Sequence, residues 1–585
     1  MYIRTTRRVN KDGSVVEYVQ LAHNYRDPES GRPKPEILFN LGRRDQLDLD
    51  VLRRLTDSIQ RFIGPADGPA APNRSFLESR PMGGAWLLRG LWDQLEIGAT
   101  LEAIAAKQGL SDPVGVVGCI WAMVANRALE PMSKHAAVDW LAGGAFVPET
   151  PEGLYDERLY RAMDFLLAAG DTLQEAVFFR AADLLSLEVD LLLYDTTSVY
   201  CEMEGDDRDL ATRAQAAAAQ DGATVTSPSR HAPQVVNEPP LRLRGHSKDH
   251  REDLAQIVVG LAVTRQGIPV RAWVWPGNTN DATTIAEVKA SLAGWRLNRV
   301  VWAVDRGMTS EDNLRILQQG GAHYIAGEKM RSGNAEALAA LARPGRYRVV
   351  DDKLEVKEVF VGEGAGRRRY VIVRNPRQAE RDRAEREAQL QLITDALARL
   401  PEDRDGHTKA VCALVAHRSL GRYLKTDARG RPSLDKAKVK AETRLDGKYL
   451  VRTSDEQLSA TDIALGYKQL GEVERAWRCL KTHLDLRPMY HRKAERIRAH
   501  VLVCWLALFL VRVAEVRSDH TWLQIRRELN KLHRGVFAGP AGRVVQTTEL
   551  TAKQRQLFQA AKVLPPRRIE AIHPASTEVQ ASSTG

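Results

Sequence analysis

The sequence predicts an α/β protein in which a mixed β-sheet domain is interrupted by an inserted subdomain. Between residues 188 and 328, apolar runs typical of buried strands are followed by amphipathic helical patterns. A polar and basic segment then runs to about residue 445, where helical patterns resume. Ahead of the sheet domain we expect a small β-containing unit at residues 1–70 and a helical domain at residues 75–188.

The first two units are separated by a linker. Residues 1–70 mix short β-like runs with basic turns, and GPADGPAAPN (64–73) ends this unit. Apolar residues then recur at steps of three and four through residues 75–188, as in packed helices. Within them, PMSKHAAVDWL (131–141) is a candidate for part of a helix-turn-helix arrangement.

The sheet domain begins with residues 189–328. Four apolar runs predict strands, and HYIAG (323–327) predicts a fifth. The four are EVDLLLYDT (188–196), LAQIVVGLAVT (254–264), IPVRAWVW (268–275) and NRVVWAVD (298–305). Helices are expected over 283–295 and 310–320, and a flexible insertion within 205–245.

An inserted segment separates the first part of the sheet domain from its second part. Residues 329–445 contain a hairpin pattern and a charged helix pattern, which we interpret as a separate inserted subdomain. Residues 446–535 are expected to complete the sheet domain with helices. Residues 536–585 are interpreted as a C-terminal tail whose last 20 residues are disordered.

Composition narrows the class of protein. The 585 residues carry a formal net charge of +10, which favours a polyanionic partner, although a solvated basic surface explains the charge equally well. The five cysteines include no C-x-x-C pair, so neither a zinc ribbon nor a disulfide framework is expected. The longest apolar run, residues 501–511, is about half of a membrane span. We therefore expect a cytoplasmic protein without a membrane segment.

Two aspartates end strands of the predicted sheet. Asp195 follows the first run, and Asp305 ends the fourth. A strand-end Asp often caps the next element, but adjacent strand ends in a mixed sheet place two such carboxylates side by side. Like charges that close repel unless a cation lies between them, and hard oxygen ligands favour Mg²⁺ or Mn²⁺.

A third carboxylate is expected from the helix pattern of residues 466–484. At 100° per residue, Leu470, Val473, Trp477, Leu480 and Leu484 form one apolar stripe. At the rim of that stripe, Tyr467, Glu474 and Lys481 are seven residues apart and stack on one face, with Arg478 beside them. We expect Glu474 to face the metal site and Tyr467, Arg478 and Lys481 to meet a phosphate backbone.

These residues resemble the bacterial insertion-sequence transposases of the DDE type that carry the signature Y-x2-R-x3-E-x6-K. Tyr467, Glu474 and Lys481 fit the signature, whereas Leu470 stands in its Arg position, and either Arg475 or Arg478 supplies the charge instead. The phrases that carry the resemblance are YDTTS, GHSKDHREDLAQ, PGNTND, VDRGM and LKTHLDLRPMYHRKAERIRAH, in the expected order.

The resemblance implies an RNase H-like catalytic core in which Asp195, Asp305 and Glu474 hold two divalent ions, Mg²⁺ with Mn²⁺ as a substitute. It implies cleavage and strand transfer of double-stranded DNA, at the element's ends and at the target, by a homodimer. Residues 75–188 would bind the DNA ends, and the inserted subdomain would cover the active site. Further DNA contacts are expected from Lys248, Arg487, Arg492 and Lys493.

Other readings remain open at this stage. A metal-dependent nuclease on the same fold, or a catalytically inactive DNA-binding relic, would share most of these residues. His246 and His250 are four apart, but no third zinc ligand follows at a typical spacing. Asn278 and Asp281 follow the third strand and could form a polar loop near the metals; for Asp281 the N-cap of the following helix is favoured instead, and for Asn278 the question is left open.

Overall fold

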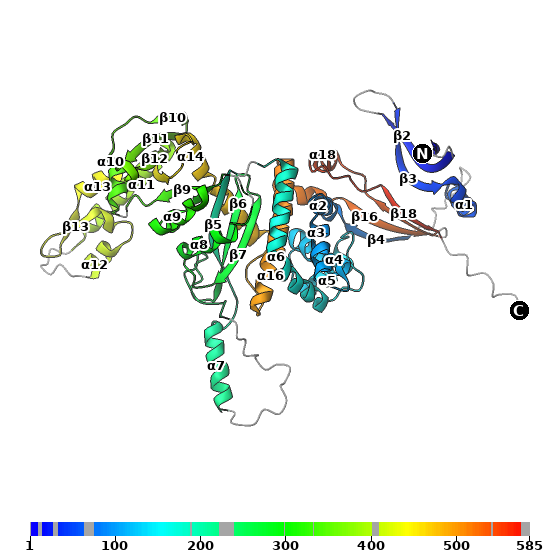
Figure 1. Ribbon diagram of the computed structural model, residues 1–585, viewed down its shortest axis with the longest axis horizontal. Helices are drawn as coiled ribbons and strands as arrows, with labels where there is room; N and C mark the ends of the chain where they lie inside the picture. The colour runs from blue at the N-terminus through cyan, green and yellow to red at the C-terminus, as the bar shows by residue number, and fades with distance from the viewer. Residues whose placement is uncertain are drawn as a thin grey trace. The chain divides into compact units, whose positions relative to one another are not determined.

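The computed structural model describes most of the chain and divides into two compact units (Figure 1). Unit 1 comprises Met1–Leu185, Cys479–Leu486 and His491–Gly585, and unit 2 comprises Ser186–Arg478 and Arg487–Tyr490. The described residues are 2–9, 15–26, 33–63, 75–187, 190–220, 239–295, 297, 299–331, 333–400, 409–539 and 542–574. Each unit is considered by itself.

Unit 1 begins with a three-stranded antiparallel sheet. Strands β1 (Tyr2–Val9), β2 (Val15–Arg26) and β3 (Pro33–Arg43) pair in sequence order. Helix α1 (Leu49–Ile63) follows them. β-structure therefore occupies the segment in which the sequence predicts a β-containing unit.

The helical part of unit 1 is built around one long apolar helix. Helix α16 (Ala494–Ser518) packs against α4 (Pro113–Leu129) and α6 (Asp156–Leu185), and α2 (Gly83–Gln94) and α3 (Ile97–Lys107) complete the cluster. By length and composition α16 could cross a membrane, but 89% of its most apolar window is buried inside the protein. Such burial is typical of a core helix.

The candidate helix-turn-helix segment forms only a short helix. Helix α5 (Lys134–Asp139) has six residues and begins at Ser133, whose hydroxyl accepts from the Ala136 amide. Lys134 and Ala137 are buried. His135 and Asp139 are exposed, so the helix-turn-helix assignment stays a prediction.

The C-terminal segment is structured, which differs from the tail expected at 536–585. Strands β4 (Ser75–Pro81), β16 (His533–Gly539), β17 (Gly542–Thr547) and β18 (Ile569–Pro574) form an antiparallel sheet in the order β18-β17-β16-β4. Helix α17 (Trp522–Leu529) precedes β16 in the sequence, and helix α18 (Ala552–Ala560) lies between β17 and β18. Residues 575–585, part of the stretch expected to be disordered, lie outside the described residues.

Unit 2 contains a nine-stranded mixed sheet, as the sequence predicts in outline. Its first five strands are β5 (Leu191–Tyr200), β6 (Gln256–Thr264), β7 (Pro269–Pro276), β8 (Val301–Val304) and β9 (His323–Glu328). In space their order is β7-β6-β5-β8-β9, with β6 antiparallel to both of its neighbours, β5 and β7, and with β5, β8 and β9 parallel. All nine residues of β6 are buried, which explains the unbroken apolar run in its sequence.

The two helices predicted between these strands are present. They are α8 (Ile285–Ser291) and α9 (Glu311–Gln318). Ser310 caps α9 by accepting a hydrogen bond from the Asn313 amide. Within the expected flexible insertion, residues 207–220 form helix α7 (Asp207–Gln220), and residues 221–238 lie outside the described residues.

The inserted segment does not form a wholly separate subdomain. Its strands β10 (Arg348–Asp351), β11 (Leu354–Val361) and β12 (Arg368–Arg374) continue the main sheet through β15 (Lys448–Thr453), which pairs with β9. Helix α10 (Ala335–Ala342) packs on this extension. Strand pairing across more than 100 residues of chain is not readable from local sequence, which explains the difference.

A second part of the insertion has its own small core. It consists of α11 (Pro376–Ala398), α12 (Lys409–Ala416), the β13–β14 hairpin (Leu424–Thr426 and Pro432–Leu434) and α13 (Lys436–Thr443). Ile393, Tyr423 and Leu424 are its buried centre. The expected charged helix at about 378–400 is α11.

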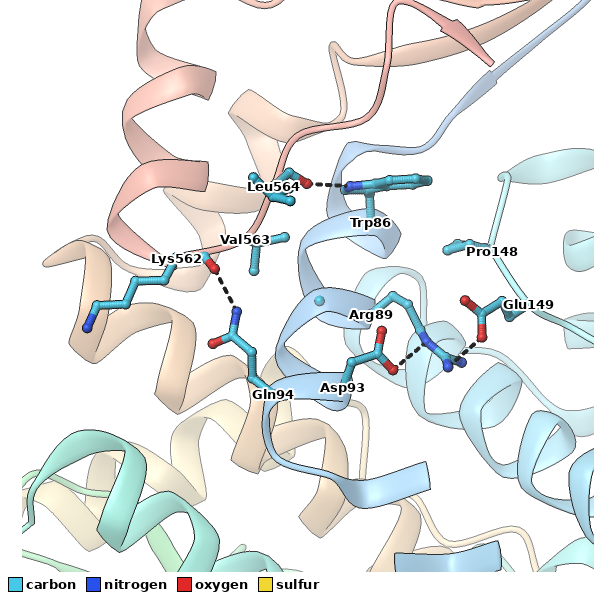
Figure 2. Close-up of a pocket in the computed structure, with 10 residues that line it drawn as sticks. Trp86, Arg89, Asp93, Gln94, Pro148, Glu149, Lys562, Val563 and Leu564 are labelled. Carbon is cyan, nitrogen blue, oxygen red and sulfur yellow. Dashed lines mark hydrogen bonds and ion pairs between the residues drawn. The ribbon is translucent and has the colours of Figure 1, made fainter. Parts of the chain in front are cut away.

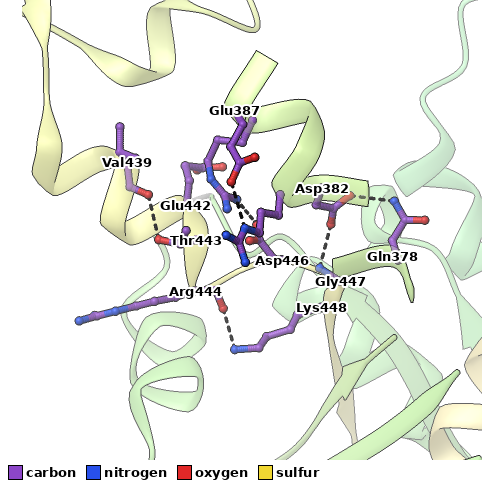
Figure 3. A network of polar contacts seen from close by, with 12 residues as sticks. Gln378, Asp382, Glu387, Val439, Glu442, Thr443, Arg444, Asp446, Gly447 and Lys448 are labelled. Carbon is purple, nitrogen blue, oxygen red and sulfur yellow. Dashed lines mark hydrogen bonds and ion pairs between the residues drawn. The ribbon is translucent and has the colours of Figure 1, made fainter. Parts of the chain in front are cut away.

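Polar contacts attach α11 to the start of β15 (Figure 3). The Asp382 carboxylate accepts from the Gly447 amide at 2.8 Å and from the Gln378 side chain at 2.7 Å, and Arg386 pairs with Asp446. Gly447 has φ +64°, and a Cβ there would lie 2.4 Å from the Asn375 carbonyl oxygen. Only glycine fits this junction without strain.

Candidate active site

The pairing of β5 with β8 brings Asp195 and Asp305 to neighbouring positions of the sheet. These strands are parallel, and Tyr194 lies opposite Val304. The next residue of each strand is therefore Asp195 and Asp305 respectively. Asp305 follows the end of β8 as expected, whereas Asp195 lies within β5, which continues to Tyr200 in its pairing with β6, so the expectation that Asp195 ends its strand is wrong.

Lys248 inserts its ammonium group among oxygens at this part of the sheet. Its Nζ donates to the Thr196 carbonyl at 2.7 Å and the Thr196 hydroxyl at 2.9 Å. It also lies 2.9 Å from Asp281 Oδ2 and 3.7 Å from Asp195 Oδ1. One lysine is therefore shared by two carboxylates from different parts of the chain and compensates only one of their two negative charges.

Apart from Lys248, the surroundings of Asp195 mostly disfavour the charged form of its carboxyl group. Burial raises the pKa of the Asp195 carboxyl above its usual value, while the Lys248 ammonium lowers it. The charges of Asp281 and Asp305 add to the raising effect. The site therefore concentrates negative charge and binds cations favourably.

The loop that carries Lys248 is anchored by hydrogen bonds. The Lys248 amide donates to the Ser198 hydroxyl at 2.8 Å, which ties the loop to β5. The buried Ser247 hydroxyl accepts from the Arg251 amide at 3.0 Å. Next to the lysine, Asp249 forms an ion pair with Arg487 at 2.5 Å. Lys248 thus starts from a fixed backbone position.

Tyr467 contacts the second aspartate. Its hydroxyl donates to Asp305 Oδ1 at 3.3 Å, and burial, followed by the Asp305 charge, raises the pKa of this tyrosine to about 12. A Cβ on Gly327 of β9 would lie 2.0 Å from the same hydroxyl oxygen. The absence of a side chain at Gly327 therefore makes room for Tyr467.

The single helix expected over 466–484 is two helices. α14 (Ala460–Lys468) ends in a turn at Gln469 and Leu470, and α15 (Gly471–Thr482) begins after it. Two backbone hydrogen bonds close the turn. The Leu470 amide donates to the Tyr467 carbonyl, and the Glu472 amide donates to the Gln469 carbonyl. Tyr467 therefore does not stack on the same helix face as Glu474 and Lys481. Glycine at position 471 weakens helix continuity, and this break overrides the apolar periodicity.

The apolar stripe of that region is otherwise as expected. Val473, Trp477, Leu480 and Leu484 are buried, and Leu470 is partly buried. Leu470, in the signature's Arg position, lies in the turn between the helices. Arg475 pairs with Glu472 at 3.2 Å, and Arg478 is exposed.

The donor chemistry of the two aspartates fits a hard divalent cation, because both offer carboxylate oxygens. Glu474 lies in the first turn of α15 and is exposed. Across the described part of the chain, no three His, Cys, Asp or Glu side chains come close enough to hold a metal ion. Glu474 is therefore not gathered with Asp195 and Asp305, and the same finding gives no support to a zinc site at His246 and His250.

The remaining predicted DNA contacts divide between the units. Arg478 and Arg487 belong to unit 2, whereas Lys481, Arg492 and Lys493 belong to unit 1. Arg492 and Lys493 are exposed directly before α16. Arg487 is engaged by Asp249.

Asp281 lies at the site, although the N-cap interpretation was favoured for it. The side chain that caps the following helical turn is Asn280, which accepts from the Ala282 amide, and Asp281 instead contacts Lys248. The N-cap reading of Asp281 is therefore wrong. Both residues sit in NTND, where either side chain suits a cap, so sequence gives no signal to choose between them.

Unit 1 contains a pocket of about 340 Å³ beside α2 (Figure 2). Arg89 crosses it and pairs with Asp93 at 3.0 Å and Glu149 at 2.5 Å. The C-terminal segment closes one side, where the Leu564 carbonyl accepts from the Trp86 indole at 2.8 Å. Three of its charged groups, Arg89, Asp93 and Glu149, are paired with one another, and we assign the pocket no functional role.

Comparison with known families gives two matches. Residues 3–69 match the model of the IS1634 family transposase N-terminal domain, and residues 240–510 match that of the transposase DDE domain. The second range includes Asp305 and Glu474 and begins after Asp195. Among curated proteins no match is found.

One solved structure that the chain resembles is the cryo-EM structure of the piggyBac transposase synaptic complex with hairpin DNA. The two chains are 9% identical, with a TM-score of 0.34. The likeness covers 78% of this chain and 82% of that one.

Proposed function

The chain belongs to the DDE transposases of bacterial insertion sequences, and from this premise we propose that Asp195, Asp305 and Glu474 are its catalytic carboxylates. The observation that carries the proposal is the parallel pairing of β5 and β8, which sets Asp195 and Asp305 side by side. Two carboxylates held this way by buried strands are pre-positioned for a shared cation. The sheet order β7-β6-β5-β8-β9 supports an RNase H-like core.

Transposases of this type depend on divalent metal ions, and we propose Mg²⁺, with Mn²⁺ as a substitute. When bound, such ions activate the attacking water or 3′-hydroxyl and stabilise the leaving oxygen. Asp195 and Asp305 would hold them from the sheet, and Glu474 would join from α15. Because Glu474 is exposed at the start of α15, its approach requires α15 or its side chain to move toward the sheet.

The neighbours of the carboxylates have positioning roles in this proposal. Tyr467 donates to Asp305 and so fixes the orientation of that carboxylate. Lys248, a third exposed, has an ammonium group within reach of a phosphate brought to the aspartates. The pair Arg487–Asp249 holds the loop that carries Lys248.

As a transposase the protein acts on DNA, and we propose that its basic residues bind the phosphate backbone at the element's ends and at the target. These basic residues are Arg478, Lys481, Lys248, Arg487, Arg492 and Lys493, and the hydroxyl of Tyr467 is proposed to join them. Residues 75–188 are proposed to recognise the ends. Two copies would act together in the cytoplasm, each on one end. Light scattering with end DNA would give the mass of the complex.

A cleavage assay tests the carboxylates. Purified protein is incubated with labelled DNA carrying the ends that flank its own gene, in Mg²⁺, in Mn²⁺ and in EDTA. Asp195→Asn, Asp305→Asn and Glu474→Gln should each lower the cleavage rate by about 10³-fold, since each removes a metal ligand worth several kcal/mol. Asp312→Asn, an exposed aspartate of α9, is the matched control and should cleave normally.

The products separate the alternatives. Ends joined to target DNA identify strand transfer, and cleavage without joining identifies a nuclease. Specific binding without cleavage in either metal identifies an inactive relic. Normal cleavage by Asp195→Asn or Asp305→Asn would remove the two aspartates from the active site.

A further inference from the structure

Lys248 occupies the place where a cation is needed. Its ammonium group lies within 3.7 Å of Asp195 and 2.9 Å of Asp281, and it also donates to two oxygens of Thr196. Oxygen ligands around a positive charge are the environment that a divalent ion also prefers. The lysine therefore satisfies the carboxylates in the absence of metal.

We propose that Lys248 is a resident counter-cation that competes with divalent ions for Asp195, and that Asp281 is the positioning residue that retains it. This inference rests on the proposed function, because it concerns the same carboxylates. It adds a fourth acidic residue, Asp281, whose contact is with the lysine. Asp281 lies after β7, at the end of the phrase PGNTND, and is not one of the three carboxylates that the resemblance assigns to the metal site.

The geometry supports displacement of the ammonium group alone. The backbone of Lys248 is fixed by Ser198 and the loop is braced by Ser247. Its side chain is a flexible four-carbon stem whose end is about a third exposed. A divalent ion on Asp195 would share that carboxylate with the ammonium, and like charges at such separations repel strongly. The ammonium group must then shift toward Asp281, which holds it at the shorter distance.

The direct test measures metal affinity without catalysis. Free Mn²⁺ is followed by electron paramagnetic resonance during titration of the full-length protein without DNA. Lys248→Met should bind Mn²⁺ about tenfold more tightly than the wild type, because its competitor is gone. Lys248→Gln, which keeps a polar side chain, should show the same direction. Lys353→Met, on the exposed β10–β11 turn, matches the change in net charge and should change affinity less than about twofold.

Asp281 is tested by a double-mutant cycle. Asp281→Asn alone should weaken Mn²⁺ binding, because Lys248 then turns fully to Asp195 and Thr196. In the Lys248→Met background the same substitution should change affinity less than about twofold. An equal loss in both backgrounds would make Asp281 a direct metal ligand and overturn its positioning role.

Two further outcomes separate this inference from the proposed function. Asp195→Asn should abolish Mn²⁺ binding in every background. If it does so while folded Lys248→Met and Lys248→Gln bind Mn²⁺ no more tightly than the wild type, competition by Lys248 is overturned and the carboxylate site stands. If the wild type and all variants bind no Mn²⁺, both fall.

Discussion

Two lysines in different units meet opposite surroundings. Lys248 in unit 2 has its ammonium group among the oxygens of Asp195, Asp281 and Thr196. Lys134 in unit 1 is only 4% exposed and lies near Arg127, with its charge also felt by His500. Burial, followed by the Arg127 charge, lowers the pKa of Lys134 to about 7.

The difference shows that the charges around a lysine decide whether its ammonium form is favoured in this protein. Carboxylates around Lys248 stabilise its charge, so it serves as a cation that another cation can replace. Around Lys134 the neighbours are themselves basic, so the neutral amine is favoured. The basic surroundings of Lys134 therefore disfavour its charge, whereas the acidic surroundings of Lys248 favour a cation.

The largest expected effect is on the free energy of unfolding of Lys134→Met. The unfolded lysine holds its proton up to a pH of about 10, whereas the folded one releases it near 7, so wild-type stability rises with pH between these values. The rise should reach about 2 kcal/mol between pH 7 and pH 9. Lys134→Met should be more stable than the wild type at pH 7 and lack this rise. Urea unfolding at both pH values measures it.

The control for that variant is Lys107→Met, an exposed lysine at the end of α3 in the same unit. It should keep the wild-type dependence on pH. The contrast between the two lysines would be broken if Lys134→Met kept that dependence as well.

The next effect tests a steric contact at the acidic site that should not depend on the charge there. A methyl group in Gly327→Ala would lie 2.0 Å from the Tyr467 hydroxyl, so we expect destabilisation of about 1–3 kcal/mol. The loss should be the same in EDTA and in Mn²⁺, and Tyr467→Phe in the same chain should relieve part of it. Thermal melting of Gly327→Ala and of the double variant, each in EDTA and in Mn²⁺, measures these effects. Gly294→Ala, where nothing lies within 4 Å, is the matched substitution and should melt like the wild type.

The smallest effect is on the stability of Lys248→Met. Without metal, the variant leaves Asp195 and Asp281 uncompensated, and because the pair is a third exposed the expected loss is about 1 kcal/mol or less. Mn²⁺ should restore the melting temperature, because it replaces the lost charge. A stabilised variant in EDTA would contradict the role given to this lysine, and Lys353→Met should show no response to Mn²⁺ beyond that of the wild type.

The sequence predicted the parts of unit 2 that depend on local patterns. The strands β5 to β9 were readable because each is a short apolar run, and Asp195 and Asp305 were readable because each ends such a run. Their adjacency needed only the parallel pairing of β5 with β8. Long-range pairings were beyond reach, including that of β4 with β16 and that of β12 with β15.

Two features of the site were missed for different physical reasons. The break at Gln469 and Leu470 interrupts a continuous apolar stripe, because backbone hydrogen bonding there favours a turn over periodicity. The contact of Lys248 with Asp281 joins residues of two loops, and loop side chains carry no periodic signal. Both are products of tertiary structure.

The place of the insertion in the sheet has a consequence for how such a chain is assembled. The chain leaves the core at Glu328 and returns on β15, where Leu450 lies directly opposite Glu328. In the topology of the sheet, the chain between β9 and β15 is therefore the connection of one antiparallel strand pair. A loop of this kind lengthens at a small entropic cost, since closure entropy grows only with the logarithm of length. Neither β5 nor β8 pairs with a strand of the insertion, so a change in the length of the insertion leaves the pairing that sets Asp195 beside Asp305 in place.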